Sequence, residues 1–322
     1  MDSVIESSFV RYAGGFRTDR VNKGVFMIRK ILGIALFLCS ASLFQTEPAI
    51  AAQAAKGCTR ATLQAAVDSY IAAQQAGNLS KMSLASNVKY VQNWGEVNKE
   101  EGLWNSPLPV AFHRSILDVD ACRTFTEVIV TEGNQYVIGT RLTVENGKIS
   151  EIESMYTTKR DWLFNAENYL KYSLAEDWRI LNADERVDRK TLIAAGDAYF
   201  DHFSDRSVQV PWGTPCVRLE GGMYTARNID DPNNNCNLGF PIDMLPMKDR
   251  SYVVDVDMGT VNIFTLFGNP PGAPDSHTYR VVNGKIRYIH TLSLTVPRVD
   301  PWDIMGRQPE QKPKSNPPAK TQ

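Results

Sequence analysis

The feature that most constrains the fold of this chain is a pattern that occurs twice. Residues 144–158 read VENGKISEIESMYTT, and residues 281–295 read VVNGKIRYIHTLSLT. In each copy an Asn-Gly pair lies between runs of alternating apolar and polar residues. Such a pair predicts a β-hairpin, because Asn and Gly both tolerate the positive φ angles of a type I′ turn.

A second match lies upstream of each hairpin and has helical spacing. Residues 62–73 read TLQAAVDSYIAA, and residues 191–202 read TLIAAGDAYFDH. The helix match is offset by 129 residues and the hairpin match by 137, so both copies share one order of elements. We interpret the chain as a tandem duplication, with a first repeat over 57–160 and a second repeat over 190–300.

Each repeat is predicted to be an α+β domain. Helical patterns come first and strand-like runs follow, so we expect N-terminal helices packed in a strongly curved antiparallel sheet. In the second repeat, the segment 210–241 is rich in Gly, Pro and Asn, which predicts irregular loops, and residues 252–268 read as a hairpin. Between the repeats, the aromatic segment 161–189 is expected to be a helical connector that packs across both.

The N-terminal region has the features of an export signal. From Met27, two basic residues precede an apolar run that is followed by Ala49-Ile50-Ala51, a cleavage site of small residues. We therefore expect a signal peptide over 27–51 and an over-extended start over 1–26. The protein would then be periplasmic or secreted, without stable membrane insertion after signal removal. The alternative is a single anchoring helix.

Composition limits the kind of partner. A chain of 322 residues with a formal net charge of −1 is long enough for two domains but has no long-range field to recruit nucleic acid or an anionic membrane. A small molecule is the expected partner, and a homodimer could form through the sheet faces. The Pro/Lys/Gln-rich end over 303–322 is expected to be disordered.

Four cysteines remain once Cys39 is removed with the signal peptide. An even number in an exported chain suggests one disulfide in each repeat, Cys58 with Cys122 and Cys216 with Cys236. Metal binding is the alternative, but the sequence contains no Cys-x-x-Cys pair.

Several longer strings resemble a known protein family. They are HRSILD (113–118), DWLFNA (161–166), RLEGGMYT (218–225), PDSHTYRV (274–281) and NGKIRYIHTL (283–292). Together they resemble a family of secreted tandem-repeat proteins of mostly unassigned function, in the nuclear-transport-factor-two-like (SnoaL-like) superfamily. The resemblance implies two tandem cone-shaped domains. Relatives in that superfamily are cofactor-free cyclases, isomerases, dehydratases, epoxide hydrolases and lyases, and some are purely binding modules. One branch of the lyases acts on lignin-derived diarylpropanes.

The residues themselves favour acid–base chemistry without a cofactor. GxSxG, P-loop, G-x-G-x-x-G and HExxH motifs are absent from the sequence. A cone-shaped pocket would need a proton acceptor and a donor beside the ligand. His277 beside Asp275 is a catalytic candidate; the alternatives are a structural histidine and an aspartate that caps a turn.

The last strand of each repeat supplies further catalytic candidates. Comparison of the repeats aligns Glu153 with His290 and Glu151 with Tyr288. Period-2 alternation places Ile286, Tyr288 and His290 on one face of the strand. Either this face lines the cone, where Glu153, Tyr288 and His290 would act on the ligand, or it is solvated.

Candidate binding residues lie at predicted strand ends and turns. Arg114, next to His113, could hold an anionic or phenolic oxygen through paired N–H donors, or could form a structural pair with Asp118. Tyr224 follows a Gly-Gly pair, which permits close approach of a ligand or forms a tight turn. His202 lies near a helix end, where a surface or dipole role is favoured. Aromatic residues that would form flat pocket walls, or else core, are Tyr90, Trp94, Trp104 and Trp212.

Two functions from different classes follow. The first is an exported, cofactor-independent lyase, isomerase or dehydratase acting on a small hydroxylated aromatic molecule, for which lignin-derived compounds are one source. The alternative is a non-catalytic periplasmic ligand-binding or partner-binding module. A pocket with convergent polar groups would favour the enzyme, and a filled cone with an exposed apolar sheet face would favour the partner-binding module.

Overall fold

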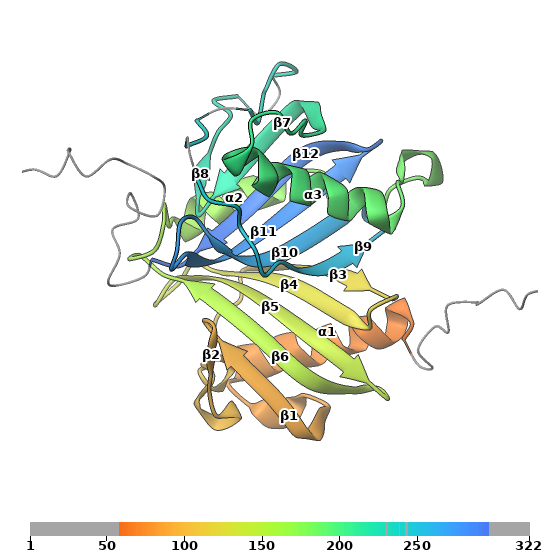
Figure 1. Cartoon of the computed structure of the whole chain (residues 1–322). Coiled ribbons are helices and arrows are strands. Elements are labelled where there is room, and N and C mark those ends of the chain that lie inside the picture. The colour runs from red at the N-terminus through yellow and green to blue at the C-terminus, as the bar shows by residue number, and fades with distance from the viewer. Residues whose placement is uncertain (1–57, 229–230, 238, 242–243, 296–322) are drawn as a thin grey trace, which may run out of the picture. The chain divides into compact units, whose positions relative to one another are not determined.

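Two six-stranded sheets form the framework of the described chain (Figure 1). The computed structural model describes residues 58–295 apart from 229–230, 238 and 242–243. All of the described residues belong to one compact unit of the chain, Ala51–Gln322. The expected start, signal peptide and disordered tail lie outside the described residues.

The first repeat opens with α1 (Arg60–Ala76) and η1 (Leu79–Lys81). The remaining elements, in chain order, are β1 (Leu84–Gln92), β2 (Gly95–Glu96), η2 (Lys99–Glu101), η3 (Leu103–Asn105), β3 (Phe112–Asp118), β4 (Arg123–Val130), β5 (Tyr136–Glu145) and β6 (Lys148–Thr157). Side by side in the sheet, the strands have the order β2-β1-β6-β5-β4-β3.

The second repeat follows a connector made of α2 (Ala166–Ala175) and η4 (Ala183–Glu185). Its elements are α3 (Arg189–Ser204), β7 (Trp212–Glu220), β8 (Met223–Tyr224), β9 (Ser251–Asp255), β10 (Thr260–Phe267), β11 (Ala273–Val282) and β12 (Lys285–Ser293). The sheet order is β8-β7-β12-β11-β10-β9, which matches the first sheet position by position. The predicted tandem layout of two α+β parts therefore agrees with the structure.

Two details of the predicted sheets are wrong. Strands β1 and β7 run parallel to β6 and β12, so the sheets are mixed rather than antiparallel. Asn-Gly turns specify only neighbouring antiparallel strands, and both turns are present, with Asn146 and Asn283 at φ 51° and 52°. The segment 210–241 was also expected to be irregular, yet it contains β7 and β8. A proline, Pro215, is accommodated in β7 because it lies where the register between β7 and β12 shifts.

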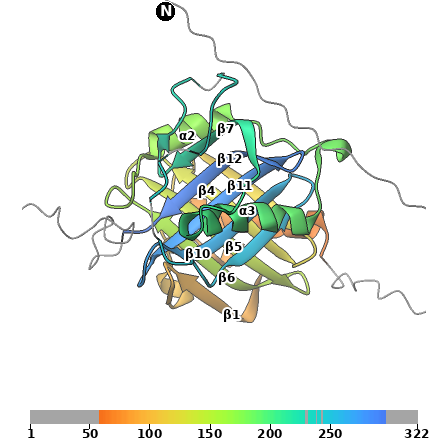
Figure 2. The same cartoon turned by 45° about the horizontal axis from the view of Figure 1, so that its top comes forward.

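The first helix of each repeat packs on one side of its own sheet, called here the helix face. Helix α1 buries Leu63, Val67 and Tyr70 in one core, and α3 buries Leu192 and Tyr199 in another. Figure 2 shows α3 lying across β10, β11 and β12. The opposite sides of the two sheets, called the junction faces, pack on each other and on the connector in a third core, which includes Ile116, Phe125, Met155, Tyr169, Trp178, Leu219, Phe264 and Leu292.

Two ion pairs, each between a buried aspartate and a partly exposed arginine, join the repeats reciprocally. Arg60 of α1 contacts Asp255 of β9 at 2.8 Å, and Arg189 of α3 contacts Asp118 of β3 at 2.6 Å. The arginines are 129 residues apart and the aspartates 137, the same offsets as in the sequence repeat. Each aspartate also accepts a backbone N–H from the other repeat. The offsets of the sequence match therefore recur in the interface, and the strand order recurs in the two sheets.

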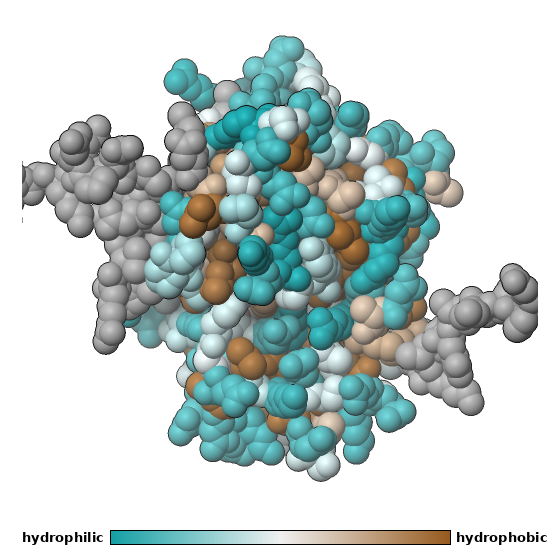
Figure 3. Space-filling view, in the orientation of Figure 1, coloured by the Kyte–Doolittle hydropathy of each residue, from teal (hydrophilic) through white to brown (hydrophobic). Residues whose placement is uncertain are grey.

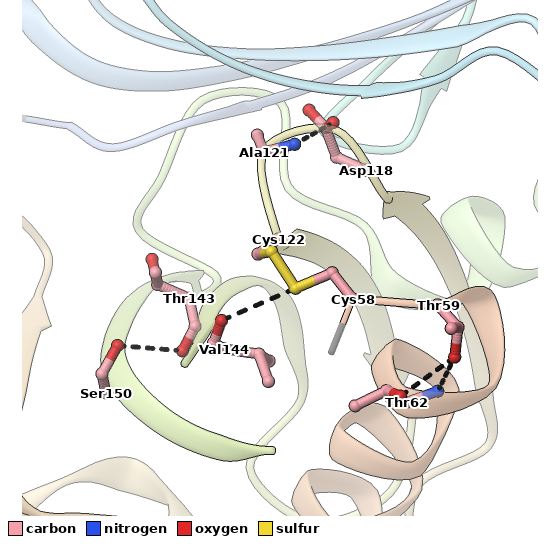
Figure 4. The surroundings of a disulfide bond; sticks show 9 residues. All are labelled: Cys58, Thr59, Thr62, Asp118, Ala121, Cys122, Thr143, Val144 and Ser150. Atoms are coloured by element: carbon pink, nitrogen blue, oxygen red, sulfur yellow. Dashed lines mark hydrogen bonds between the residues drawn. A yellow bond between two sulfur atoms is a disulfide. The ribbon is translucent and has the colours of Figure 1, made fainter. Parts of the chain in front are cut away.

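The predicted disulfides Cys58–Cys122 and Cys216–Cys236 are both present. Cys58 directly precedes Thr59, whose side chain caps α1, so the first bond ties the start of that helix to the turn between β3 and β4 (Figure 4). Two disulfides fit a protein that folds in an oxidising compartment.

Removing either disulfide should lower stability according to the length of loop that it closes. The bonds span 64 and 20 residues, for which the chain-entropy relation gives about 4 and about 3 kcal/mol. We expect Cys58→Ala/Cys122→Ala to lose more stability in urea denaturation than Cys216→Ala/Cys236→Ala. Equal unfolding midpoints for the wild type and both variants would contradict this.

The surface in the orientation of Figure 1 carries apolar residues as separate spots among polar ones (Figure 3). Within the part of the chain that the structure describes, no helix is both long and apolar enough to cross a membrane. The junction faces, which were expected to offer a homodimer surface, cover each other within one chain. A homodimer therefore stays a prediction.

Candidate functional site

The helix face of the second sheet brings together the polar residues of strand β11. Asp275, His277 and Tyr279 alternate along the strand and so lie on one face. Tyr279 belongs to the core that α3 forms with the sheet, which fixes this face as the helix face. Helix α3 comes close here because Gly196 leaves room: a Cβ at this position would lie 2.5 Å from Ile263.

Asp275 and His277 form a buried pair. The carboxylate oxygen Oδ1 of Asp275 accepts from Nδ1 of His277, and Oδ2 accepts from the hydroxyl of Ser293 on β12. Asp275 is fully buried and His277 is 2 % exposed. No hydrogen bond joins Nε2 of His277 to any residue that the structure describes. With Nδ1–H held by the carboxylate, Nε2 carries the free lone pair of the ring.

A phenol without a partner lies beside this pair. The Tyr279 hydroxyl is buried and makes no hydrogen bond among the described residues. Its ring is 5.9 Å from that of His277 and 5.4 Å from that of Tyr199. Burial, and then the neighbouring Tyr199 and Asp275, raise the pKa of Tyr279 well above 10. The phenol therefore stays protonated at neutral pH and can donate a proton or a hydrogen bond.

Aromatic rings surround the histidine. The ring of His277 is 5.0 Å from Phe200, 5.3 Å from Tyr199 and 5.7 Å from Phe267. Arg218 on β7 forms an ion pair with Glu220, with Nε 3.2 Å from Oε1. The Arg218 guanidinium also lies 5.1 Å from the centre of the Phe240 ring. The helix face therefore combines an oriented imidazole base, a protonated phenol and aromatic side chains. These groups could transfer a proton to or from a ring-containing ligand.

The first repeat lacks the corresponding groups. At the offset of 137 residues, Ile138 and Thr140 occupy the positions of Asp275 and His277, and Leu142 that of Tyr279. Thr140 instead exchanges hydrogen bonds with Tyr70 and Ser154, at 2.8 and 3.0 Å. No ionisable base replaces the histidine at this position, so the acid–base pair belongs to the second repeat.

His290 lies in neither of the two expected environments. A β-bulge shifts the register between Ile286 and Tyr288, so Ile286 belongs to the helix-side core while Tyr288 and His290 turn to the junction face. The shared face expected for Ile286 and His290 is therefore wrong. A bulge cannot be seen in period-2 counting, because one extra residue reverses the faces of all that follow. His290 is 1 % exposed and packs against the first repeat, neither lining the helix face nor solvated.

Around His290 the junction holds a cluster of charged and aromatic side chains. Nδ1 of His290 is 3.0 Å from Glu127 on β4, and Nε2 is 2.6 Å from Glu176 after α2. Arg114 on β3 donates to Glu127 at 2.9 Å, with its guanidinium 4.0 Å from the ring of Trp178. Arg114 and His290 were predicted as site residues from the sequence, but their carboxylate partners, Glu127 and Glu176, were not. A charge inside the apolar strand RTFTEVIV was the available signal for Glu127.

Other predicted residues are spread over the structure. Tyr288 stacks near Trp178, and Tyr224 stacks on Tyr172 at 4.0 Å, both at the edge of the junction. His113 is exposed, and Glu153 is half-buried on the junction face. Tyr90 and Trp104 pack on each other in the core of the first repeat at 3.9 Å. The remaining residues considered have structural contacts: Asp118 pairs with Arg189, Glu151 with Arg123, His202 with the Val208 carbonyl, Trp94 with Phe264 and Trp212 with Phe240.

Comparison with known proteins shows that the second repeat is similar to a family model without an assigned activity. A family model described as a domain of unknown function (DUF8021) matches residues 185–293, which contain Asp275, His277 and Tyr279. A search of curated proteins found no match.

Among solved structures, a nuclear-transport-factor-two-like protein of unknown function from Burkholderia xenovorans LB400 is similar at 12% identity and a TM-score of 0.27, over 35% of this chain and 95% of that protein. AclR of Streptomyces galilaeus, described as a candidate hydroxylase, is similar at 18% identity and a TM-score of 0.24, over 31% of this chain and 92% of AclR. Likenesses of this degree carry no argument about the activity of this chain.

The described residues contain no group of three or more His, Cys, Asp or Glu side chains placed to hold a metal ion. Chemistry without a cofactor nevertheless stays a prediction, since it rests on the resemblance and on the residues of the acid–base pair.

Proposed function

We propose that this chain is an exported, cofactor-independent lyase, isomerase or dehydratase, built of two nuclear-transport-factor-two-like domains of which the second is active. The substrate would be a small hydroxylated aromatic molecule. The observation that carries the proposal is the buried Asp275–His277 pair with a free Nε2, beside the unpartnered hydroxyl of Tyr279.

Each residue has a distinct role in this proposal. Nε2 of His277 takes a proton from the substrate, and the electron pair left behind moves onto an adjacent oxygen of the substrate. Asp275 orients the ring and stabilises the imidazolium, as the aspartate does in other Asp–His pairs. The Tyr279 hydroxyl donates a hydrogen bond to the developing oxyanion. The oxyanion then re-forms its C=O bond. In an isomerisation the imidazolium protonates another carbon; in an elimination a C=C bond forms, the C–O bond of a neighbouring carbon breaks and the departing oxygen takes the proton from the imidazolium.

Two further features favour an enzyme over a partner-binding module. The polar groups converge among aromatic rings, as in small-molecule sites. The apolar sheet faces that a partner-binding module would expose are the junction faces, which cover each other. Phe200, Phe267 and Tyr199 lie within 6 Å of the His277 ring, so a ligand that reaches Nε2 would meet aromatic side chains.

The proposal is tested by identifying what the purified full chain retains. Mass spectrometry of the small molecules released on denaturation would supply candidates, and hydroxylated aromatics, including lignin-derived diarylpropanes, would be added as a panel. We expect the wild type to convert at least one of them to a product of the same composition, or to one lacking water or formaldehyde. Retained compounds that all return unaltered after prolonged incubation would overturn the enzyme assignment and support a ligand-binding module.

A further inference from the structure

The junction cluster contains a histidine that faces a carboxylate on each side of its ring. Nδ1 of His290 is 3.0 Å from Oε2 of Glu127, and Nε2 is 2.6 Å from Oε2 of Glu176. A neutral imidazole has only one N–H, so it can donate to one of these carboxylates and must direct a lone pair at the other. Only the imidazolium form donates to both. The two carboxylates therefore favour the charged ring, whereas Arg114, with a guanidinium nitrogen 3.2 Å from Nδ1, favours a neutral ring that accepts there.

Charge balance leads to the same state. Glu127 and Glu176 bring two negative charges into the cluster, and Arg114 brings one positive charge. The side chains of Glu127, Glu176 and His290 are at most 4 % exposed. A neutral His290 would leave one negative charge uncompensated in a buried place, which is costly. A charged His290 makes the cluster neutral.

We propose that the junction is a proton-controlled lock, in which a protonated His290 stabilises the docking of the connector and the first repeat on the second sheet, and this stabilisation is lost when His290 loses its proton. All three parts contribute a charged group to this cluster: Glu127 comes from the first repeat, Glu176 from the connector and His290 from the second repeat. The proposal concerns how the repeats dock and does not rest on the proposed catalysis.

Of the charged groups that face His290 from neighbouring elements, the carboxylates of Glu127 and Glu176 favour the imidazolium and the guanidinium of Arg114 opposes it. A guanidinium nitrogen of Arg114 on β3 lies 3.2 Å from Nδ1 of His290, and the same nitrogen donates to Glu127. Among these neighbours, Arg114 is the only positively charged group and so the only one that repels a charged His290. Burial alone would lower the pKa of His290, but Glu176 and Glu127 outweigh it and raise the pKa to about 8. The neutral neighbours are Tyr169, Trp178, Tyr224 and Tyr288, of which Tyr169 donates to Glu127 and Trp178 to Glu176.

The sign of the pH effect follows from this pKa. The unfolded chain has His290 near its ordinary pKa of 6.5, below the folded value of about 8. The folded state therefore binds the proton more tightly, and the stabilisation is complete below about pH 6.5. It is lost as the pH rises through about 8.

Two measurements on the full chain test the lock. The imidazole nitrogen signals of His290 should titrate in NMR with a midpoint near pH 8. In Glu176→Gln, which removes one of the two carboxylates, the midpoint should move down by about one unit. Thermal unfolding from pH 6 to 9.5 should show His290→Gln melting roughly 4–8 °C below the wild type at pH 6, with the gap closing as the pH rises through 8.

His113→Gln is the matched control, because His113 is exposed on the same strand as Arg114. Its melting temperatures should follow those of the wild type at every pH. The proposal is overturned if the gap between His290→Gln and the wild type stays constant from pH 6 to 9.5. It is equally overturned if the His290 midpoint is the same in the wild type and Glu176→Gln.

Discussion

Replacing His277 by Gln is expected to lower kcat/KM by about 10²–10⁴-fold, the range that a positioned general acid or base contributes. Glutamine fills a similar space and can still bond to Asp275, but it has no basic nitrogen to accept a proton from the substrate. The loss should therefore appear mainly in kcat. Asp275→Asn should have a loss of similar size, because a neutral amide cannot stabilise the imidazolium that forms and can turn its NH2 group to Nδ1, which favours the wrong tautomer.

The first repeat offers the matched control for this prediction. Thr140 occupies the position that His277 has in the second repeat and bonds to Tyr70 rather than to an acid. Thr140→Val should leave kcat unchanged, although the buried Tyr70 hydroxyl loses its partner and the melting temperature falls. Turnover that survives intact in both His277→Gln and Asp275→Asn would remove the acid–base assignment. Equal losses in Thr140→Val and His277→Gln would show that both repeats act.

Asp118→Ala should produce the largest loss of stability of any single substitution proposed for this chain, about 3–5 kcal/mol, as for other broken buried ion pairs. The Asp118 carboxylate is fully buried and accepts from both guanidinium nitrogens of Arg189 at 2.6 and 2.8 Å. It also accepts from the backbone N–H groups of Ala121 and Val254, at 3.0 and 2.8 Å. Alanine satisfies none of these donors.

Asp120 provides the control for this substitution. It lies two residues further on, is exposed and makes no ion pair among the described residues, so Asp120→Ala should change the free energy of unfolding by less than about 0.5 kcal/mol. Urea denaturation followed by circular dichroism measures both variants. Asp255→Ala, the counterpart in the second repeat, should resemble Asp118→Ala. A loss below about 1 kcal/mol for Asp118→Ala would show that the reciprocal pairs contribute little.

Local patterns predicted local structure well. The two Asn-Gly pairs predicted the hairpin turns, and the helical spacing over 62–73 and 191–202 predicted the faces that α1 and α3 bury. Asp275 and His277 were paired correctly because residues two apart on a strand share a face. All of these depend on neighbours within a few residues.

Features that depend on distant partners could not be read in this way. The bulge near Arg287 changes the face of His290, and its position depends on how β12 pairs with β7 and β11. Glu127 is 163 residues from His290, and Glu176 is 114 residues away. No periodicity within one strand connects such groups. The sequence therefore showed which residues of β12 differ between the repeats, but not that one of them faces the other repeat.

The reciprocal pairs also bear on the order in which the chain can become folded. Arg60 contacts an aspartate 195 residues later, whereas Arg189 contacts one 71 residues earlier. During synthesis the first repeat emerges before Arg189, the partner of Asp118, and before the second sheet, which covers Ile116, Phe125 and Met155. Contacts of such long range form late and together. The two repeats are then halves of one cooperative folding event, and neither has a finished surface of its own.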